Sequence, residues 1–130
     1  TYVFIGHDLH VVRYVSDRVM VMYLGQVAEL GPGETLFSQP LHPYTRALTA
    51  SMPTMDPDRR TEEAPLAGDP PNPINPPSGC RFHTRFAAAE PACAQRVPAL
   101  SSTATPHEVA CLMYEPGSGH TRAPAAREAA

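Results

Sequence analysis

Proline limits what this chain can fold into more than any other feature of its sequence. Sixteen of the 130 residues are proline and eight are glycine. Because proline fixes φ and has no backbone N–H to donate, long stretches cannot be regular helix or strand. Five prolines fall within residues 69–78, where we expect an extended, polyproline-like strap. Apolar residues cluster before about residue 52, so the sequence predicts a compact first part and a loop-dominated second part.

The first part has the patterns of an α/β unit. Tyr2–Ile5 is an apolar, β-favouring run that stops at Gly6, which predicts a strand buried on both faces of a parallel sheet. The later patterns predict, in order, a helix at 8–16, a strand at 19–24, a hairpin partner at 26–30, a helix at 34–37 and a helix from Pro43 that ends before Pro53. One strand–helix–strand unit cannot cover both faces of its sheet, so we expect further strands upstream of Thr1.

Charge and hydropathy argue against several classes of protein. The formal net charge is −3 without a basic cluster, whereas a nucleic-acid binder needs clustered cations to neutralise phosphates. All ten basic residues are arginine, so the chain cannot supply the lysine of a phosphate-binding loop or of a Schiff base. No run approaches the roughly 18 to 20 apolar residues of a membrane span, and no basic stretch precedes Thr1–Ile5 as in a signal peptide. We therefore expect no nucleic-acid partner and no direct membrane insertion.

His7 is the first candidate for chemistry. It directly follows the expected strand 2–5, at the edge where open α/β sheets bind ligands. Its imidazole can donate a hydrogen bond to a phosphate oxygen or orient a water molecule, and Asp8 could fix its tautomer or cap the next helix. Position alone favours the simpler interpretation, in which His7 serves local hydrogen bonding.

A set of motifs around His7 changes that interpretation. The chain contains IGHDL at 5–9, SDRV at 16–19 and VMYLGQV at 21–27. This order resembles the switch region that closes the ATP-binding domain of ABC transporters, although the family more often has Ser at the position of Gly6. The resemblance implies that His7 is the catalytic switch histidine, which senses the terminal phosphate of ATP across from the catalytic carboxylate.

Two later motifs narrow the family. The chain contains PLHPYTRAL at 40–48 and PINPPSGCRFHTR at 73–85. They look like the C-terminal extension of oligopeptide and dipeptide importer ATPases, and with the switch region the resemblance covers about residues 1–114. It implies an α/β fold in which 1–52 is the incomplete C-terminal portion of an ABC ATPase sheet, 53–68 a linker, and 69–114 a loop-rich, proline-rich extension with cysteines. Composition predicts that the tail, 115–130, is disordered.

The resemblance also implies a cellular role. The intact subunit would bind ATP and magnesium, pair with a second ATP-binding subunit, and drive membrane-spanning permease subunits from the inner face of the cell membrane. This chain has no glycine-rich phosphate loop, signature motif or catalytic carboxylate, so we expect no ATP turnover by the chain alone. Its own contribution would be the switch histidine and an extension for regulation and interaction.

The cysteines motivate a rival hypothesis. Cys80, Cys93 and Cys111 cannot all pair within the chain, so a closed disulfide framework is not expected and a reducing compartment is indicated. In part of the importer family a similar region holds an iron–sulphur cluster with four cysteines, and the second of them would fall at Phe86. His83 or His107 could then complete a metal site. The alternatives are free thiols, one disulfide, or a small stand-alone metal or iron–sulphur module.

Overall fold

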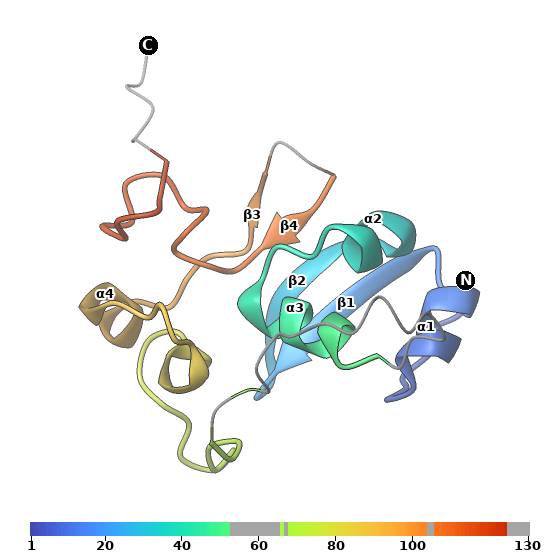
Figure 1. Cartoon of the computed structure of the whole chain (residues 1–130), viewed down its shortest axis with the longest axis horizontal. Coiled ribbons are helices and arrows are strands. Elements are labelled where there is room, and N and C mark those ends of the chain that lie inside the picture. Colours follow the sequence, from blue (N-terminus) through green and yellow to red (C-terminus); the bar gives the residue numbers. More distant parts are fainter. Residues whose placement is uncertain (53–65, 67, 104–105, 125–130) are drawn as a thin grey trace.

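The computed structural model describes residues 1–52, 66, 68–103 and 106–124, and it combines helices with a small sheet (Figure 1). The predicted mixture of helix and strand is confirmed. The elements, in chain order, are α1 Leu9–Val15, β1 Arg18–Tyr23, β2 Gln26–Pro32, α2 Gly33–Ser38, α3 Pro43–Ala50, the 3-10 helix η2 His83–Arg85, α4 Pro91–Gln95, β3 Ser101–Ser102 and β4 Glu108–Val109.

The sheet is antiparallel throughout and has the strand order β1-β2-β4-β3. The predicted hairpin is confirmed: β1 and β2 are joined by Leu24 and Gly25, whose φ angles of 46° and 77° give the turn that a two-residue hairpin favours. The other half of the sheet comes from far along the chain, since Glu29 pairs with Val109 and Leu30 with Glu108. The sequence did not indicate that the second part of the chain would extend the hairpin.

The predicted parallel strand at residues 2–5 does not form. Tyr2, Val3 and Ile5 are each at least 90% exposed, and none of the described strands lies beside them. A strand is stable only when its backbone donors and acceptors are paired by neighbours, and the described residues provide none here. An apolar run alone therefore did not determine the local structure.

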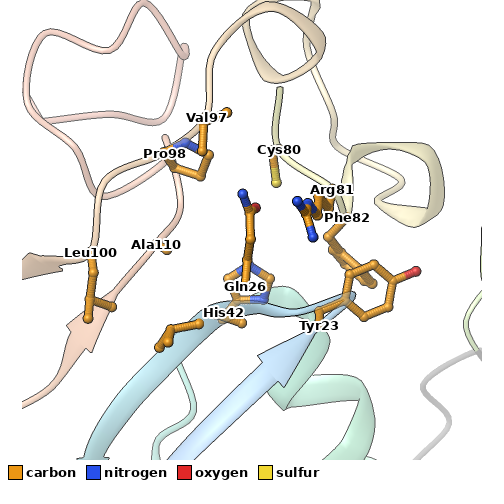
Figure 2. A pocket seen from close by; sticks show the side chains of 12 residues that line it. Tyr23, Gln26, His42, Cys80, Arg81, Phe82, Val97, Pro98, Leu100 and Ala110 are labelled. Carbon is orange, nitrogen blue, oxygen red and sulfur yellow. The ribbon is translucent and has the colours of Figure 1, made fainter. Parts of the chain in front are cut away.

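The second part of the chain is held to the hairpin and to itself by polar contacts. Arg81 donates from its guanidinium to the backbone carbonyl of Leu24 at the hairpin turn, next to the rings of Tyr23 and Phe82 (Figure 2).

Most of the expected linker, 53–68, lies outside the described residues. Along the expected strap, 69–78, the chain forms bends without helix or strand.

The beginning of the expected disordered tail folds back on the segment that contains Arg96. Residues 115–124 form turns in which Ser118 and His120 are buried, whereas 125–130 lie outside the described residues. Arg96 makes a 2.7 Å ion pair with Glu115 and donates a 2.8 Å hydrogen bond to the carbonyl of Ser118. The tail sequence provides no apolar face that could pack against a core. Residues 115–124 are held in place by these side-chain contacts instead, and composition does not predict such contacts.

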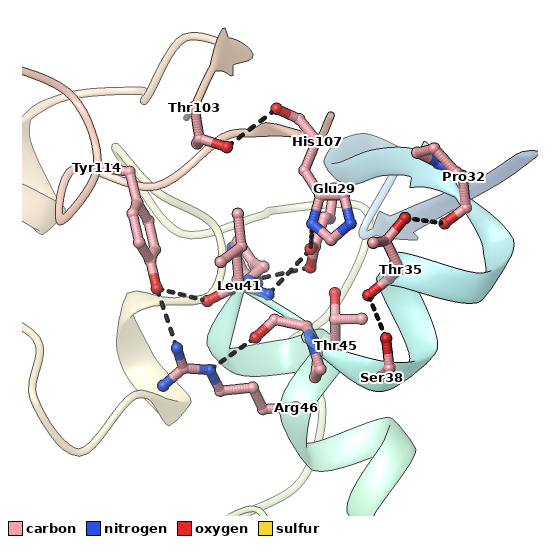
Figure 3. Close-up of polar contacts among 12 residues, drawn as sticks. Glu29, Pro32, Thr35, Ser38, Leu41, Thr45, Arg46, Thr103, His107 and Tyr114 are labelled. Atoms are coloured by element: carbon pink, nitrogen blue, oxygen red, sulfur yellow. Dashed lines mark hydrogen bonds and ion pairs between the residues drawn. The ribbon is translucent and has the colours of Figure 1, made fainter. Parts of the chain in front are cut away.

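Glu29 joins three parts of the molecule. It lies in β2 with its side chain completely buried. Its two carboxylate oxygens accept hydrogen bonds of 2.9 Å each from the backbone N–H groups of Leu41 and His42, at the start of α3. On another side, Nδ1 of His107 lies 3.2 Å from Oε1 of Glu29 (Figure 3). The carboxylate thus connects the hairpin, α3 and the segment that leads into β4.

The contact between His107 and Glu29 is close but does not have the geometry of a hydrogen bond. The two atoms are close enough for an ion pair, but neither ring nitrogen of His107 has an aligned hydrogen-bond partner among the described residues. Gly31 makes room for the ring, because a Cβ at this position would lie 2.7 Å from a His107 ring carbon. We therefore attribute the anchoring of Glu29 mainly to the two hydrogen bonds that it accepts from backbone N–H groups.

Tyr114 makes a second connection to α3. Its hydroxyl donates a 3.2 Å hydrogen bond to the carbonyl of Leu41 and accepts a 3.0 Å hydrogen bond from Arg46 (Figure 3). Leu41 thus binds Glu29 through its N–H and Tyr114 through its carbonyl. The loop before α3 is held from both sides by residues that are distant in sequence.

His42 begins α3 as its N-cap. Its Nδ1 accepts a 3.0 Å hydrogen bond from the backbone N–H of Tyr44, and Pro43 occupies the first helical position. Burial lowers the pKa of His42 to about 4, because the charged imidazolium would lose its water. The residue is therefore neutral near pH 7, and the cap bond places its ring proton on Nε2.

Replacing Glu29 by Gln should destabilise the fold. The side chain keeps its size, but one acceptor oxygen becomes an NH₂ donor that faces a backbone N–H, so we expect the free energy of unfolding to fall by about 2 kcal/mol. Urea unfolding of the full chain, followed by circular dichroism, measures this change. The control is Glu34→Gln in the exposed first turn of α2, which should cost less than about 1 kcal/mol. Equal losses in the two variants would contradict the anchor role of Glu29.

Stability should fall with decreasing pH because of His42. Between the unfolded pKa of 6.5 and the folded pKa of about 4, only the unfolded chain binds the proton, so acidification favours unfolding. Above pH 6.5 both states are neutral and this group contributes no pH dependence. The loss from pH 6.5 to pH 4 should reach about 3 kcal/mol.

The variant His42→Asn isolates this effect, since Asn also caps helices but does not titrate. Its free energy of unfolding, measured by urea titration at several pH values, should change less between pH 6.5 and pH 4 than that of the unaltered chain. The same pH dependence in both proteins would show that His42 is not the group responsible.

Candidate functional site

His7 lies just before α1 and is exposed. Asp8 accepts hydrogen bonds from the backbone N–H groups of His10 at 2.9 Å and Val11 at 3.3 Å, so it caps the helix. Of the two roles considered for Asp8, capping is therefore the one present in the structure. No described residue makes a hydrogen bond or ion pair with the His7 ring, which leaves both ring nitrogens accessible to a ligand.

A cavity lies between the hairpin turn and the second part of the chain, with a volume of about 270 Å³. Figure 2 shows Gln26 extending into the space between Cys80, Arg81 and Pro98. The lining residues are Tyr23, Gln26, Val27, Ala28, His42, Cys80, Arg81, Phe82, Val97, Pro98, Leu100 and Ala110. The walls are mainly apolar, and the polar side chains among them are those of Tyr23, Gln26, His42, Cys80 and Arg81.

An aromatic cluster forms one side of this cavity. The ring of Phe82 lies 5.2 Å from that of Tyr23 and 5.6 Å from that of Tyr44, measured between centroids. Phe86, at the position where the resemblance implied a cysteine, lies 6.3 Å from Phe82 and packs against the buried cluster of Val109, Cys111 and Met113. Phe86 is thus a packing residue, and such contacts commonly stabilise more than burial alone.

All three cysteines are free thiols, and they come from separate segments that the fold brings together. Cys80 is half-buried, and its backbone N–H donates a 2.8 Å hydrogen bond to the carbonyl of Cys93. Burial raises the pKa of Cys80, and it raises that of Cys111 to about 11. Both thiols are therefore protonated near pH 7.

The described residues do not fit a metal or iron–sulphur site. Among them, no group of three or more His, Cys, Asp or Glu side chains is arranged to hold a metal ion. Of the two histidines considered as a further ligand, His83 has Nδ1 2.8 Å from the carbonyl of Cys80, and His107 is buried against Glu29. The iron–sulphur hypothesis and the stand-alone metal module receive no support from the structure.

Glu29 is the residue that sequence reasoning missed. It lies in the expected hairpin partner, 26–30, where nothing marked it as different from the other residues of that strand. The available signal was a single carboxylate between the apolar residues Ala28 and Leu30. That signal did not identify the partners, because the N–H groups of Leu41 and His42 are 12 and 13 residues away.

None of the described helices is both long and apolar enough to cross a membrane.

Comparison with known proteins identifies the relatives of this chain. The family described as "Oligopeptide/dipeptide transporter, C-terminal region" matches residues 28–93. A putative peptide import ATP-binding protein from Brucella ovis is 52% identical over 112 residues, which are 86% of this chain and 35% of that protein. Oligopeptide transport ATP-binding protein OppF from Salmonella typhimurium is 50% identical over 116 residues, which are 88% of this chain and 34% of OppF.

A third relative extends further along the chain. A probable peptide ABC transporter ATP-binding protein from Sinorhizobium fredii is 48% identical over 124 residues, or 95% of this chain and 33% of that protein. The chain thus spans about a third of the length of the curated relatives it matches. The matched family region contains Glu29, the His42–Pro43 cap and the Arg81–Phe82 contact to the hairpin. The chain belongs to the family of C-terminal regions of oligopeptide and dipeptide ABC transporter ATP-binding proteins.

Proposed function

We propose that this chain is the C-terminal part of an ABC transporter ATP-binding subunit that energises the import of oligopeptides or dipeptides. The observation that carries the proposal is the family match over residues 28–93. Relatives named for peptide import and oligopeptide transport are 50–52% identical over most of this chain, and the chain spans about a third of their length. The remaining two thirds of such a subunit would contain the phosphate loop and catalytic carboxylate.

The proposal divides the chain into parts with different roles. Residues 1–52 would be the last portion of the ATP-binding domain, 53–68 a linker and 69–114 the importer-specific extension, followed by the tail 115–130. The extension would serve interaction and regulation. Its attachment through the β2–β4 pairing, the contact of His107 with Glu29 and the hydroxyl of Tyr114 supports a role as a rigid part of the subunit.

The exposed apolar surface at the start of the chain supports an incomplete domain. Tyr2, Val3, Ile5 and Tyr14 are at least 90% exposed, and Met20 on β1 is 54% exposed. Large contiguous apolar patches on soluble proteins mark surfaces that another element covers. In the intact subunit, strands and helices of the preceding ATP-binding segment would cover this surface and pair with residues 2–5.

His7 would be the catalytic residue contributed by this part of the subunit. Bound ATP and magnesium supply the phosphate chemistry, and a ring N–H of His7 would donate a hydrogen bond to an oxygen of the terminal phosphate. Asp8 caps α1 and so restrains the backbone that carries His7. Both ring nitrogens of His7 are unengaged by the described residues, which suits a group that acts on a ligand.

By itself the chain would not hydrolyse ATP, because it has no lysine and no phosphate-binding loop. Its partners in the transporter would be a second ATP-binding subunit and membrane-spanning permease subunits. We place it in the cytoplasm, at the inner face of the membrane, held there by these partners.

A chimera tests the proposal. In it, this chain replaces the homologous C-terminal third of Salmonella typhimurium OppF, in cells that lack unaltered OppF. The chimera should support uptake of a labelled oligopeptide, and His7→Ala should reduce uptake by about 100-fold, since a donor to the developing phosphate charge is lost. Immunoblots of the chimera should show equal amounts of protein in both strains.

His10→Ala is the matched control, because His10 is also exposed and lies in the first turn of α1, three residues after His7. Uptake by this variant should stay within about twofold of the parent chimera, as expected for a surface substitution. A soluble chimera without uptake would overturn the proposed transport role. Equal uptake by the His7 and His10 variants would overturn only the role of His7.

A further inference from the structure

Two of the three cysteines lie on backbone segments that contact each other directly. The N–H of Cys80 donates a 2.8 Å hydrogen bond to the carbonyl of Cys93, and Oγ of Ser78 donates a 2.9 Å hydrogen bond to the carbonyl of Ala94. The segment 78–80 therefore lies across the end of α4 and satisfies carbonyl groups that the short helix leaves free. This contact fixes the positions of Cys80 and Cys93 relative to each other.

Gly79 makes this close approach possible. Its φ is +65°, in the region that side chains disfavour, and a Cβ at this position would lie 2.4 Å from the carbonyl oxygen of Cys93. Any other residue would push the two segments apart. The glycine at position 79 therefore allows Cys80 to lie close to Cys93.

We propose that Cys80 and Cys93 form a redox-active pair, which a small disulfide oxidant such as glutathione disulfide converts to an intrachain disulfide. Segments joined by a backbone hydrogen bond lie about 5 Å apart, and disulfides join residues whose Cα atoms are about 4.4–6.8 Å apart. This inference goes beyond the proposed transport role and does not depend on it.

The burial of the two thiols sets the order of the reaction. Cys80 is half-buried in the wall of the cavity (Figure 2), whereas Cys93 is buried. The Cys80 thiol loses its proton, and its sulphur attacks glutathione disulfide and releases one glutathione thiolate. The Cys93 sulphur, also deprotonated, then attacks the mixed disulfide at Cys80 and releases the second. Two protein thiols are oxidised, one glutathione disulfide is reduced to two glutathione molecules, and the two thiol protons pass to them.

Cys111 is near the pair but is not a member of it. It belongs to the buried cluster with Val109 and Met113, and Leu41, Phe86 and Tyr114 pack against that cluster. No backbone hydrogen bond joins its segment to Cys80 or Cys93 among the described residues. Cys111 is therefore the natural internal control.

The disulfide would close the loop 81–92, which contains Arg81, Phe82 and Phe86. These residues contact the hairpin turn, the aromatic cluster and the core cluster respectively. Cross-linking this loop lowers the entropy of the unfolded chain without requiring new contacts in the folded one. Oxidation would therefore stiffen the attachment of the extension to the hairpin.

The test uses the full chain, treated with glutathione disulfide in the absence of air. Intact-protein mass should fall by about 2 Da without retained glutathione, and proteolytic peptides should contain the Cys80–Cys93 link. The Tm should rise by on the order of 5–15 °C, and dithiothreitol should reverse both changes. Alanine variants of each cysteine complete the experiment, because Ala fits the helix α4 and the small buried sites.

Cys111→Ala should behave like the unaltered chain, whereas Cys80→Ala and Cys93→Ala should form no intrachain link and show no rise in Tm. Peptides linked through Cys111, or stable glutathione adducts on Cys80 without ring closure, would overturn the proposal. So would a disulfide at Cys80 and Cys93 that lowers the Tm. Peptide mapping of the unaltered chain decides the question even if one variant is poorly folded.

Discussion

A buried carboxylate needs hydrogen-bond donors at fixed positions. For Glu29, these donors are backbone N–H groups at the start of α3 and in the loop before it. A carboxylate without them would be costly to bury, so the hairpin, the loop and α3 must assemble together. His107 closes the site from the segment before β4. Glu29 therefore ties the hairpin to the start of α3, and the pairing of β2 with β4, together with the hydrogen bonds of Tyr114 and Arg81, holds the second part of the chain to this unit.

Residues 40–44, which include the loop before α3 and the first residues of that helix, make several contacts that join parts of the fold. Leu41 and His42 donate to Glu29, the carbonyl of Leu41 accepts from Tyr114, and His42 caps α3. The His-Pro-Tyr sequence thus has a physical explanation: a neutral histidine accepts the cap bond, proline begins the helix, and tyrosine packs on Phe82.

The two candidate sites differ in what they need from the rest of a transporter subunit. His7 is exposed beside an uncovered apolar surface, so its proposed action on ATP requires other polypeptide. The proposed pair of Cys80 and Cys93 lies within this chain, where Gly79 and a backbone hydrogen bond bring the two residues together. Under the two proposals, His7 would contribute to a centre shared with other polypeptide, whereas the cysteine pair would act within this chain.

Sequence alone determined the features that depend on the backbone preferences of single residues. The turn at Gly25, the cap at Asp8 and the helix start at Pro43 follow from backbone preferences of single residues, and each is present. Tertiary structure decided everything that needs a distant partner: the pairing of β2 with β4, the burial of Glu29, the exposure of residues 2–5 and the order of 115–124. Hydrogen bonds between residues far apart in sequence leave no periodic pattern, so only the folded chain reveals them.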